Sequence, residues 1–220
     1  SIDLSELVDS AKERVVGKSP SDAIYNFCNI CDFNFERLAS SARKDLELYL
    51  HTTIPADYIS TDGRVVAKRP GRKVGEPIDD QETERNLQAQ MVQRYLIYVT
   101  MSVCGSILPA LQVLQLEHPL QIGHFMNICT RSPVVPVGRE GLFAKGLYAG
   151  YIGDYVTALH ILSSQIEHTL RTFLKESGAK TTVIDSVGIE TECGLSTLVD
   201  LPETKEILGA KYTFELKSLF

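Results

Sequence analysis

The chain has 220 residues, of which 44% are apolar and 23% charged, with a formal net charge of −6. That composition is typical of a soluble globular protein, with enough chain for one large domain or two small ones. The acidic balance argues against attraction of the whole surface to nucleic acid or to an anionic membrane. Only a local basic patch is left for such contacts.

Cysteine usage favours a cytoplasmic location. The five cysteines are odd in number and scattered along the chain, which is typical of reduced thiols rather than of a disulfide framework. Cys28 and Cys31 have C-x-x-C spacing, but neither a second metal-ligand pair nor a strand-to-helix context accompanies them. We interpret them as one exposed and one buried thiol of a helix. Residues 1–16 include acidic side chains and no apolar core, so we expect no secretory signal.

Residues 1–52 are predicted to form an N-terminal helical subdomain. A first helix places apolar residues on one face, namely Leu4, Leu7, Val8, Ala11 and Val15. Ser19 and Pro20 predict the start of a second helix, because serine caps a helix and proline suits its first position. A third helix is expected from about Phe35 to Leu50.

Residues 53–80 are predicted to be a basic loop or linker, and the proline and glycine content of residues 51–80 indicates a loop or a hairpin. Five cations lie within ten residues of it: Arg64, Lys68, Arg69, Arg72 and Lys73. They could contact the phosphates of RNA or DNA. Alternatively they form a solvated loop that pairs with the acidic residues at 76–84, since no aromatic residues lie among the charges to stack on bases.

Residues 81–220 are predicted to be a helical domain. One long helix begins near Asp80 and is interrupted near Gly105 and Pro109, and His118-Pro119 ends its second segment. Shorter helices are expected at 122–129, 139–150, 194–201 and 202–209, with a new one from Tyr212. A small hairpin is expected to join 181–185 to 189–192. The fold class is therefore all-α, a helical bundle with at most a small β-hairpin.

Tyr95–Leu116 contains no charged residue over 22 positions, which is long enough to span a bilayer. Polar residues dilute it, and Gly105 and Pro109 interrupt it. A helix that is apolar all round is also typical of a protein core. We therefore expect a buried helix and no membrane contact.

The most informative helix is predicted from Tyr155 to about Glu176, capped by Asp154 at its start and Gly178 at its end. Its apolar stripe comprises Tyr155, Ala158, Leu159, Leu162, Ile166, Leu170 and Phe173. Beside the stripe runs a polar row: His160, Ser164, Glu167, His168 and Arg171. Glu167 and Arg171 have the i, i+4 spacing of a structural ion pair, and the same row could instead belong to an active site.

The segment Ser132–Gly178, with its SPVVPVGRE, KGLYAG, ALHIL and LRTFL stretches, resembles the signature region of a family of unknown function found in bacteria and eukaryotes. That family carries a downstream Arg-Asn-x-x-x-His motif, which is similar to the Arg/His motif of the HEPN superfamily. HEPN proteins are small helical bundles that commonly dimerise, and many are metal-independent endoribonucleases in defence or RNA-decay systems.

The resemblance implies an RNA-cleaving or RNA-binding protein without a metal or cofactor. This chain contains no arginine followed at the required spacing by a histidine. We therefore expect it to be an N-terminal portion, inactive alone, with the catalytic pair following Phe220. The resemblance makes Glu167 and Arg171 candidates to support catalysis, with His160 as a third, and it implies a homodimer. The alternative hypothesis is a non-catalytic helical interaction or scaffold module.

Overall fold

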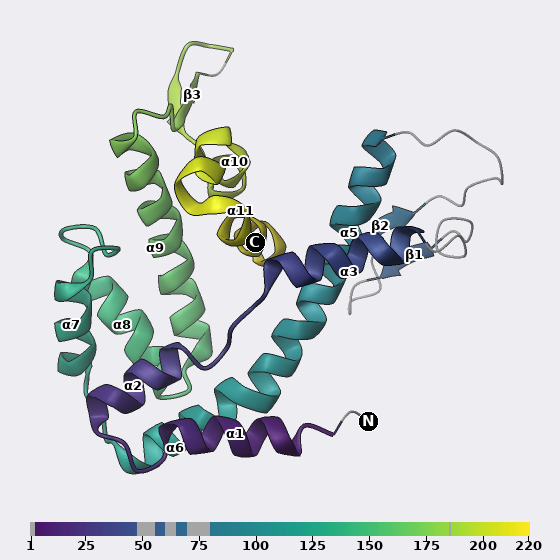
Figure 1. The fold of residues 1–220 in the computed structure, drawn as a ribbon. Helices are drawn as coiled ribbons and strands as arrows, with labels where there is room; N and C mark the ends of the chain where they lie inside the picture. The colour runs from purple at the N-terminus through teal and green to yellow at the C-terminus, as the bar shows by residue number, and fades with distance from the viewer. Residues whose placement is uncertain (1–2, 48–55, 60–64, 70–79, 185) are drawn as a thin grey trace.

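The computed structural model describes residues 3–47, 56–59, 65–69, 80–184 and 186–220. The predicted all-α class is confirmed: helices dominate, and the strands form small two-stranded hairpins. Two long helical segments diverge in Figure 1: one is α9 (Tyr155–Glu176), and the other runs through α5 (Asp80–Ser102) into α6 (Leu108–Glu117). Helices α10 (Leu195–Asp200) and α11 (Pro202–Leu219) lie between their upper parts, and α1 (Ser5–Val15) lies beneath, beside α6.

Three helices come first: α1 (Ser5–Val15), α2 (Pro20–Cys28) and α3 (Phe35–Glu47). The predicted start of α2 is confirmed, because the Ser19 hydroxyl accepts a hydrogen bond from the backbone N–H of Asp22 at 3.2 Å and Pro20 follows it. Residues 51–80 were predicted to be a loop or a hairpin. Two described parts of this region, β1 (Ala56–Ile59) and β2 (Val65–Arg69), pair as an antiparallel hairpin.

The predicted interruption of the long apolar helix near Gly105 and Pro109 takes the form of a π-helical turn. Helix α5 (Asp80–Ser102) passes through a π-helical turn (Val103–Ile107) into α6 (Leu108–Glu117). Pro109 has no N–H, and the wider turn before it, in which the Leu108 N–H reaches the Val103 carbonyl, absorbs the disruption. Gly105 is buried, and a Cβ there would lie 3.3 Å from Leu7 Cβ, so its small size lets α1 cross closely.

By length and composition, Thr83–Glu117 is the one helical stretch in the described part of the chain that is apolar enough to cross a membrane. Only 22% of its most apolar window is buried. Leu111 and Leu114 pack in the core, whereas Leu96 and Ile97 are exposed, so the expected burial holds for part of the helix. The absence of membrane contact stays a prediction.

Next come α7 (Ile122–Arg131), α8 (Glu140–Tyr151) and α9 (Tyr155–Glu176). The Asp154 carboxylate accepts a hydrogen bond from the backbone N–H of Thr157 at 3.1 Å, as expected of a cap. Helices α8 and α9 pack closely at Gly146, where a Cβ would lie 2.7 Å from Leu162.

The C-terminal part contains the predicted hairpin, formed by β3 (Thr182–Ile184) and β4 (Glu190–Glu192), and then α10 (Leu195–Asp200). Residues 202–219 form α11 (Pro202–Leu219), in which Gly209 is non-helical, with a φ of +76°, and divides the segment into two helices. The two helices predicted around Gly209 are therefore confirmed.

Within the described ranges, buried apolar residues form three clusters. The first joins α1 and α2 to α6, α7 and α8, and the second joins α3 to α5 and to Phe214 of α11. The third joins the second half of α9 to Cys193 and α10. Packing therefore runs across the predicted division at 53–80, and the proposed domain boundaries themselves stay a prediction.

Candidate functional site

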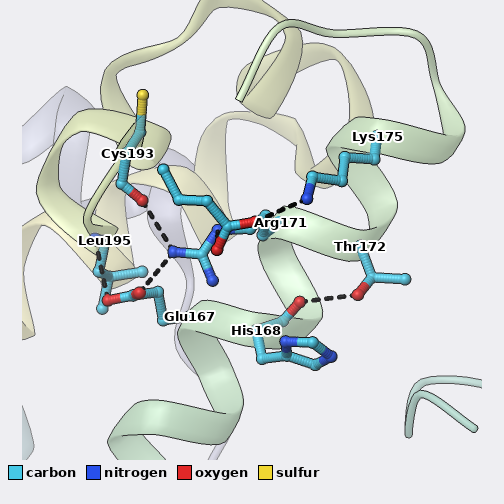
Figure 2. A network of polar contacts seen from close by, with 8 residues as sticks. Glu167, His168, Arg171, Thr172, Lys175, Cys193 and Leu195 are labelled. Carbon is cyan, nitrogen blue, oxygen red and sulfur yellow. Dashed lines mark hydrogen bonds and ion pairs between the residues drawn. The ribbon is translucent and has the colours of Figure 1, made fainter. Parts of the chain in front are cut away.

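Helix α9 places Glu167 and Arg171 on successive turns, on the side that faces β4 and α10 (Figure 2). Nη2 of Arg171 lies 2.5 Å from Oε1 of Glu167. The Arg171 side chain is only 11% exposed and that of Glu167 is 34% exposed. The predicted i, i+4 ion pair is therefore present, with a largely buried guanidinium and a carboxylate that water still reaches.

Both partners also hold the segment that leads into α10. The second oxygen of Glu167 accepts a hydrogen bond from the backbone N–H of Leu195, the first residue of α10, at 3.2 Å. The N-cap of α10 is Gly194, which has no side chain to do this. Glu167 therefore caps α10 from a neighbouring helix, and its negative charge suits a helix N-terminus.

Arg171 completes the attachment. Its Nη2 donates to the Cys193 carbonyl at 2.8 Å, and its Nε lies 3.4 Å from the Glu192 carboxylate. Lys175, one turn on, pairs with the same carboxylate at 2.7 Å (Figure 2). The hydrogen bond from Lys175 and the charge of Arg171 lower the pKa of Glu192. We call Glu167, Arg171, Lys175 and Glu192 the clamp, because they fasten β4 and α10 to α9.

The other predicted members of the row lie apart from the clamp contacts. His160 is exposed, seven residues before Glu167, and its Nδ1 lies 2.8 Å from the Val156 carbonyl, so this nitrogen carries the proton. His168 is partly buried. Burial first, and then the charges of Arg139 and Arg171, lower its pKa from the usual 6.5, so it is neutral at pH 7.

The basic cluster is described only in part. Arg64, Arg72 and Lys73 lie outside the described residues, while Lys68 and Arg69 lie in β2 opposite Asp57 and Ala56. Nucleic-acid contact by these five residues stays a prediction. Among the described residues, no three His, Cys, Asp or Glu side chains converge closely enough to hold a metal ion.

Sequence reasoning missed a cleft of about 500 Å³ between the α2–α3 linker, α5 and α11. Burial, with a smaller effect of the Glu215 charge, raises the pKa of Tyr95 to about 12. Burial also raises the pKa of Glu215. Lys211 and Asp32 pair at 3.7 Å beside it. Tyr95 and Tyr98, spaced i, i+3, could have indicated in the sequence that one face of α5 carries aromatic side chains. The sequence could not show that this face lies against α11, because that is a tertiary contact.

The C-x-x-C pair borders this cleft. Cys28 ends α2 and is exposed, whereas Cys31 is half-buried in the linker. The interpretation of one exposed and one buried thiol of a helix is therefore right for Cys28 only, because Cys31 is half-buried and follows the end of α2. A thiol at the C-terminal end of a helix also lacks the dipole that activates redox cysteines at helix N-termini.

No protein-family model, no curated protein and no solved structure matches this chain.

Proposed function

We propose that this chain is a helical interaction module that self-associates through the corner between α8 and α9. The observation that carries the proposal is the absence of charge at the start of α9. From Tyr155 to Ser164 there is no Asp, Glu, Lys or Arg, although most of these residues reach the surface.

Apolar side chains occupy that uncharged surface. Val156 is 71% exposed and Leu159 63%, and Tyr155 and Ile152 are each more than half exposed. We call these four residues the α8–α9 corner. Exposed apolar side chains gathered at one helix end are typical of the core of a protein–protein interface, and here Asp154 is the exposed charged residue between Ile152 and Tyr155.

A second copy of the chain is the partner we propose. The corner is formed by one helix end and the turn before it, so two copies can bring the same surface together around a two-fold axis. The resemblance to HEPN bundles, which commonly pair, supports the same partner. The clamp favours this non-catalytic role, because Glu167 and Arg171 are engaged with the backbone of residues 193–195.

Size-exclusion chromatography with light scattering tests the proposal. The wild-type chain should elute with twice the monomer mass at micromolar concentration, and a Val156→Glu/Leu159→Glu variant should be monomeric. Tyr25→Glu is the matched control, since Tyr25 is 70% exposed on α2, outside the corner. A monomeric wild-type protein, or a corner variant that still dimerises, would contradict the proposal.

RNA cleavage or binding is the second candidate function, and one observation on α9 supports it. His168, neutral at pH 7, lies within the influence of Arg139, Arg171 and Lys175. A neutral imidazole among cations is suited to accept a proton beside a phosphate group. The Arg/His motif of the resembled family does not occur in this chain, so the resemblance is what suggests RNA as the substrate.

An assay with labelled RNA and a chelator would test this second function. RNA binding that Arg139→Ala weakens, or cleavage that His168→Ala abolishes, would support it. Val156→Glu/Leu159→Glu is the control, because both residues lie on the first turns of α9 and not at His168. An RNA affinity that Arg139→Ala leaves unchanged would remove the role proposed for these residues.

A further inference from the structure

The cleft between the α2–α3 linker, α5 and α11 has the size of a small-molecule site. Its volume is about 500 Å³, within the roughly 300–1,000 Å³ of typical ligand pockets. Aromatic, apolar and charged side chains share its lining. No residue of the α8–α9 corner or of the clamp lines it, so neither self-association nor the clamp accounts for this cleft.

Two aromatic rings that border the cleft remain accessible. Tyr98 is partly buried, and packing holds its ring, whose centroid lies 5.2 Å from that of Phe33 and 6.3 Å from that of Tyr95. Tyr212, on α11, is 57% exposed. Phe33 and Tyr95 are themselves buried, so they support Tyr98 rather than face the cleft.

An ammonium group of the chain itself already uses this lining. Nζ of Lys211 lies over the ring of Tyr212, 5.7 Å from its centroid, and 3.7 Å from the Asp32 carboxylate. Aromatic faces attract cations within about 6 Å of the ring centroid. A cation in this part of the molecule can therefore meet an aromatic ring and a carboxylate together.

Glu215 adds a negative charge that no cation pairs with. Lys211 and Asp32 offset each other, and among the described residues no cationic group forms an ion pair with Glu215. Burial raises the pKa of Glu215 in spite of the nearby charge of Lys211, because the carboxylate is poorly hydrated there. A cation that enters the cleft would reduce this cost.

We propose that this cleft binds a small organic ammonium ion of the choline class. The carboxylate of Glu215 attracts the positive charge, and the rings of Tyr98 and Tyr212 contact the methyl groups. A trimethylammonium group suits this lining, because it has no N–H donors that would need partners and it is attracted to aromatic faces.

Isothermal titration calorimetry of the whole chain with choline and with neohexyl alcohol tests the site. Neohexyl alcohol has the shape of choline, with carbon in place of the charged nitrogen. At constant salt, the wild-type protein should bind choline saturably and about fivefold to thirtyfold tighter than the alcohol, as cation–π attraction in a partly desolvated site predicts. Glu215→Gln should remove most of this preference. Glu206→Gln is the matched control, because Glu206 is exposed on the same helix and outside the cleft.

Lys211→Met provides a second test with the opposite sign. It removes the competing cation and leaves Asp32 unpaired, so choline should bind about twofold to fivefold tighter. A merely structural role of Lys211 would leave the affinity for choline unchanged or lower it. Either of these results would overturn the proposal, as would the absence of saturable choline binding to the wild-type protein or a full preference for choline in Glu215→Gln.

Phosphatidylcholine vesicles distinguish a free ion from a lipid headgroup. The headgroup carries a phosphate close to its ammonium, and Glu215 and Asp32 would repel that phosphate, so the chain should not sediment with the vesicles. Sedimentation that choline reverses would assign the trimethylammonium group to a lipid and overturn the free ion as the ligand.

Discussion

Replacing Arg171 with methionine removes the centre of the clamp while keeping a side chain of similar length. The substitution takes away the hydrogen bond to the Cys193 carbonyl and the ion pair with Glu167. A hydrogen bond to a charged group contributes about 1.5–3 kcal/mol. Because Glu167 is one-third exposed, water screens it, and the loss of its partner adds less than about 1 kcal/mol.

We therefore expect Arg171→Met to lower the free energy of unfolding by about 2–4 kcal/mol. Urea denaturation followed by far-ultraviolet circular dichroism measures this. The unfolding midpoint should fall by about 1–2 M urea at the slope usual for a chain of this size. Glu167→Gln keeps an acceptor for the Leu195 N–H and should cost only about 1 kcal/mol.

Lys175→Met is the matched control. Lys175 lies one turn from Arg171 and pairs with the same Glu192, but both side chains of that pair are half exposed. Such surface pairs contribute about 0–1 kcal/mol. If Arg171→Met were no more costly than Lys175→Met, the clamp would not be what holds α10 to α9, and the structural role assigned to Arg171 would be wrong.

Two further predictions concern α8 and α9. Gly146→Ala should destabilise the protein by about 1–2 kcal/mol, because the new methyl group would lie 2.7 Å from Leu162, whereas Gly141→Ala, with open space around it, should be neutral or stabilising in the same urea assay. Equal stabilities of the two variants would contradict the close packing.

The pKa of His168 is lowered below 6.5, first by burial and then by neighbouring cations, so this histidine binds a proton more readily in the unfolded chain than in the folded one. The contribution of neutral His168 to the free energy of unfolding is complete above about pH 6.5. It is lost as the pH falls through the pKa that His168 has in the folded protein. Between about pH 7 and pH 5, His168→Gln should flatten the pH dependence of unfolding relative to wild type; a slope unchanged from wild type would refute this.

Much of the secondary structure could be predicted because the signals are local. Ser19 and Asp154 lie at the helix starts that their side chains cap, and Gly178, with φ +83°, follows the end of α9. The helix end predicted at Gly209 is confirmed, because this glycine is non-helical with a φ of +76°. The interruption predicted near Gly105 and Pro109 is also present, as a π-helical turn whose form the sequence does not show.

The face of α9 was predicted less well. Tyr155 and Leu159 belong to the predicted apolar stripe, yet both are exposed, because α10 and α11 cover the second half of α9, where Leu170 and Leu174 are buried. Periodicity shows which residues share a face, but it cannot show how far along a helix its neighbours extend. The same limit applies to the candidate site. His160 and Arg171 share the predicted polar row, but His160 is exposed whereas Arg171 is buried against β4 and α10.

The sequence by itself determined that this protein is helical, where most helices begin and end, and that Glu167 and Arg171 can pair. These properties depend on side-chain spacing and on caps within one turn. Only the tertiary structure decided what that pair does. It became the clamp because β4 and α10 return to α9 and present the Cys193 carbonyl and the Leu195 N–H to it. Backbone groups 22 to 28 residues away in the chain have no signature in local spacing, so their partners appear only when the chain is folded.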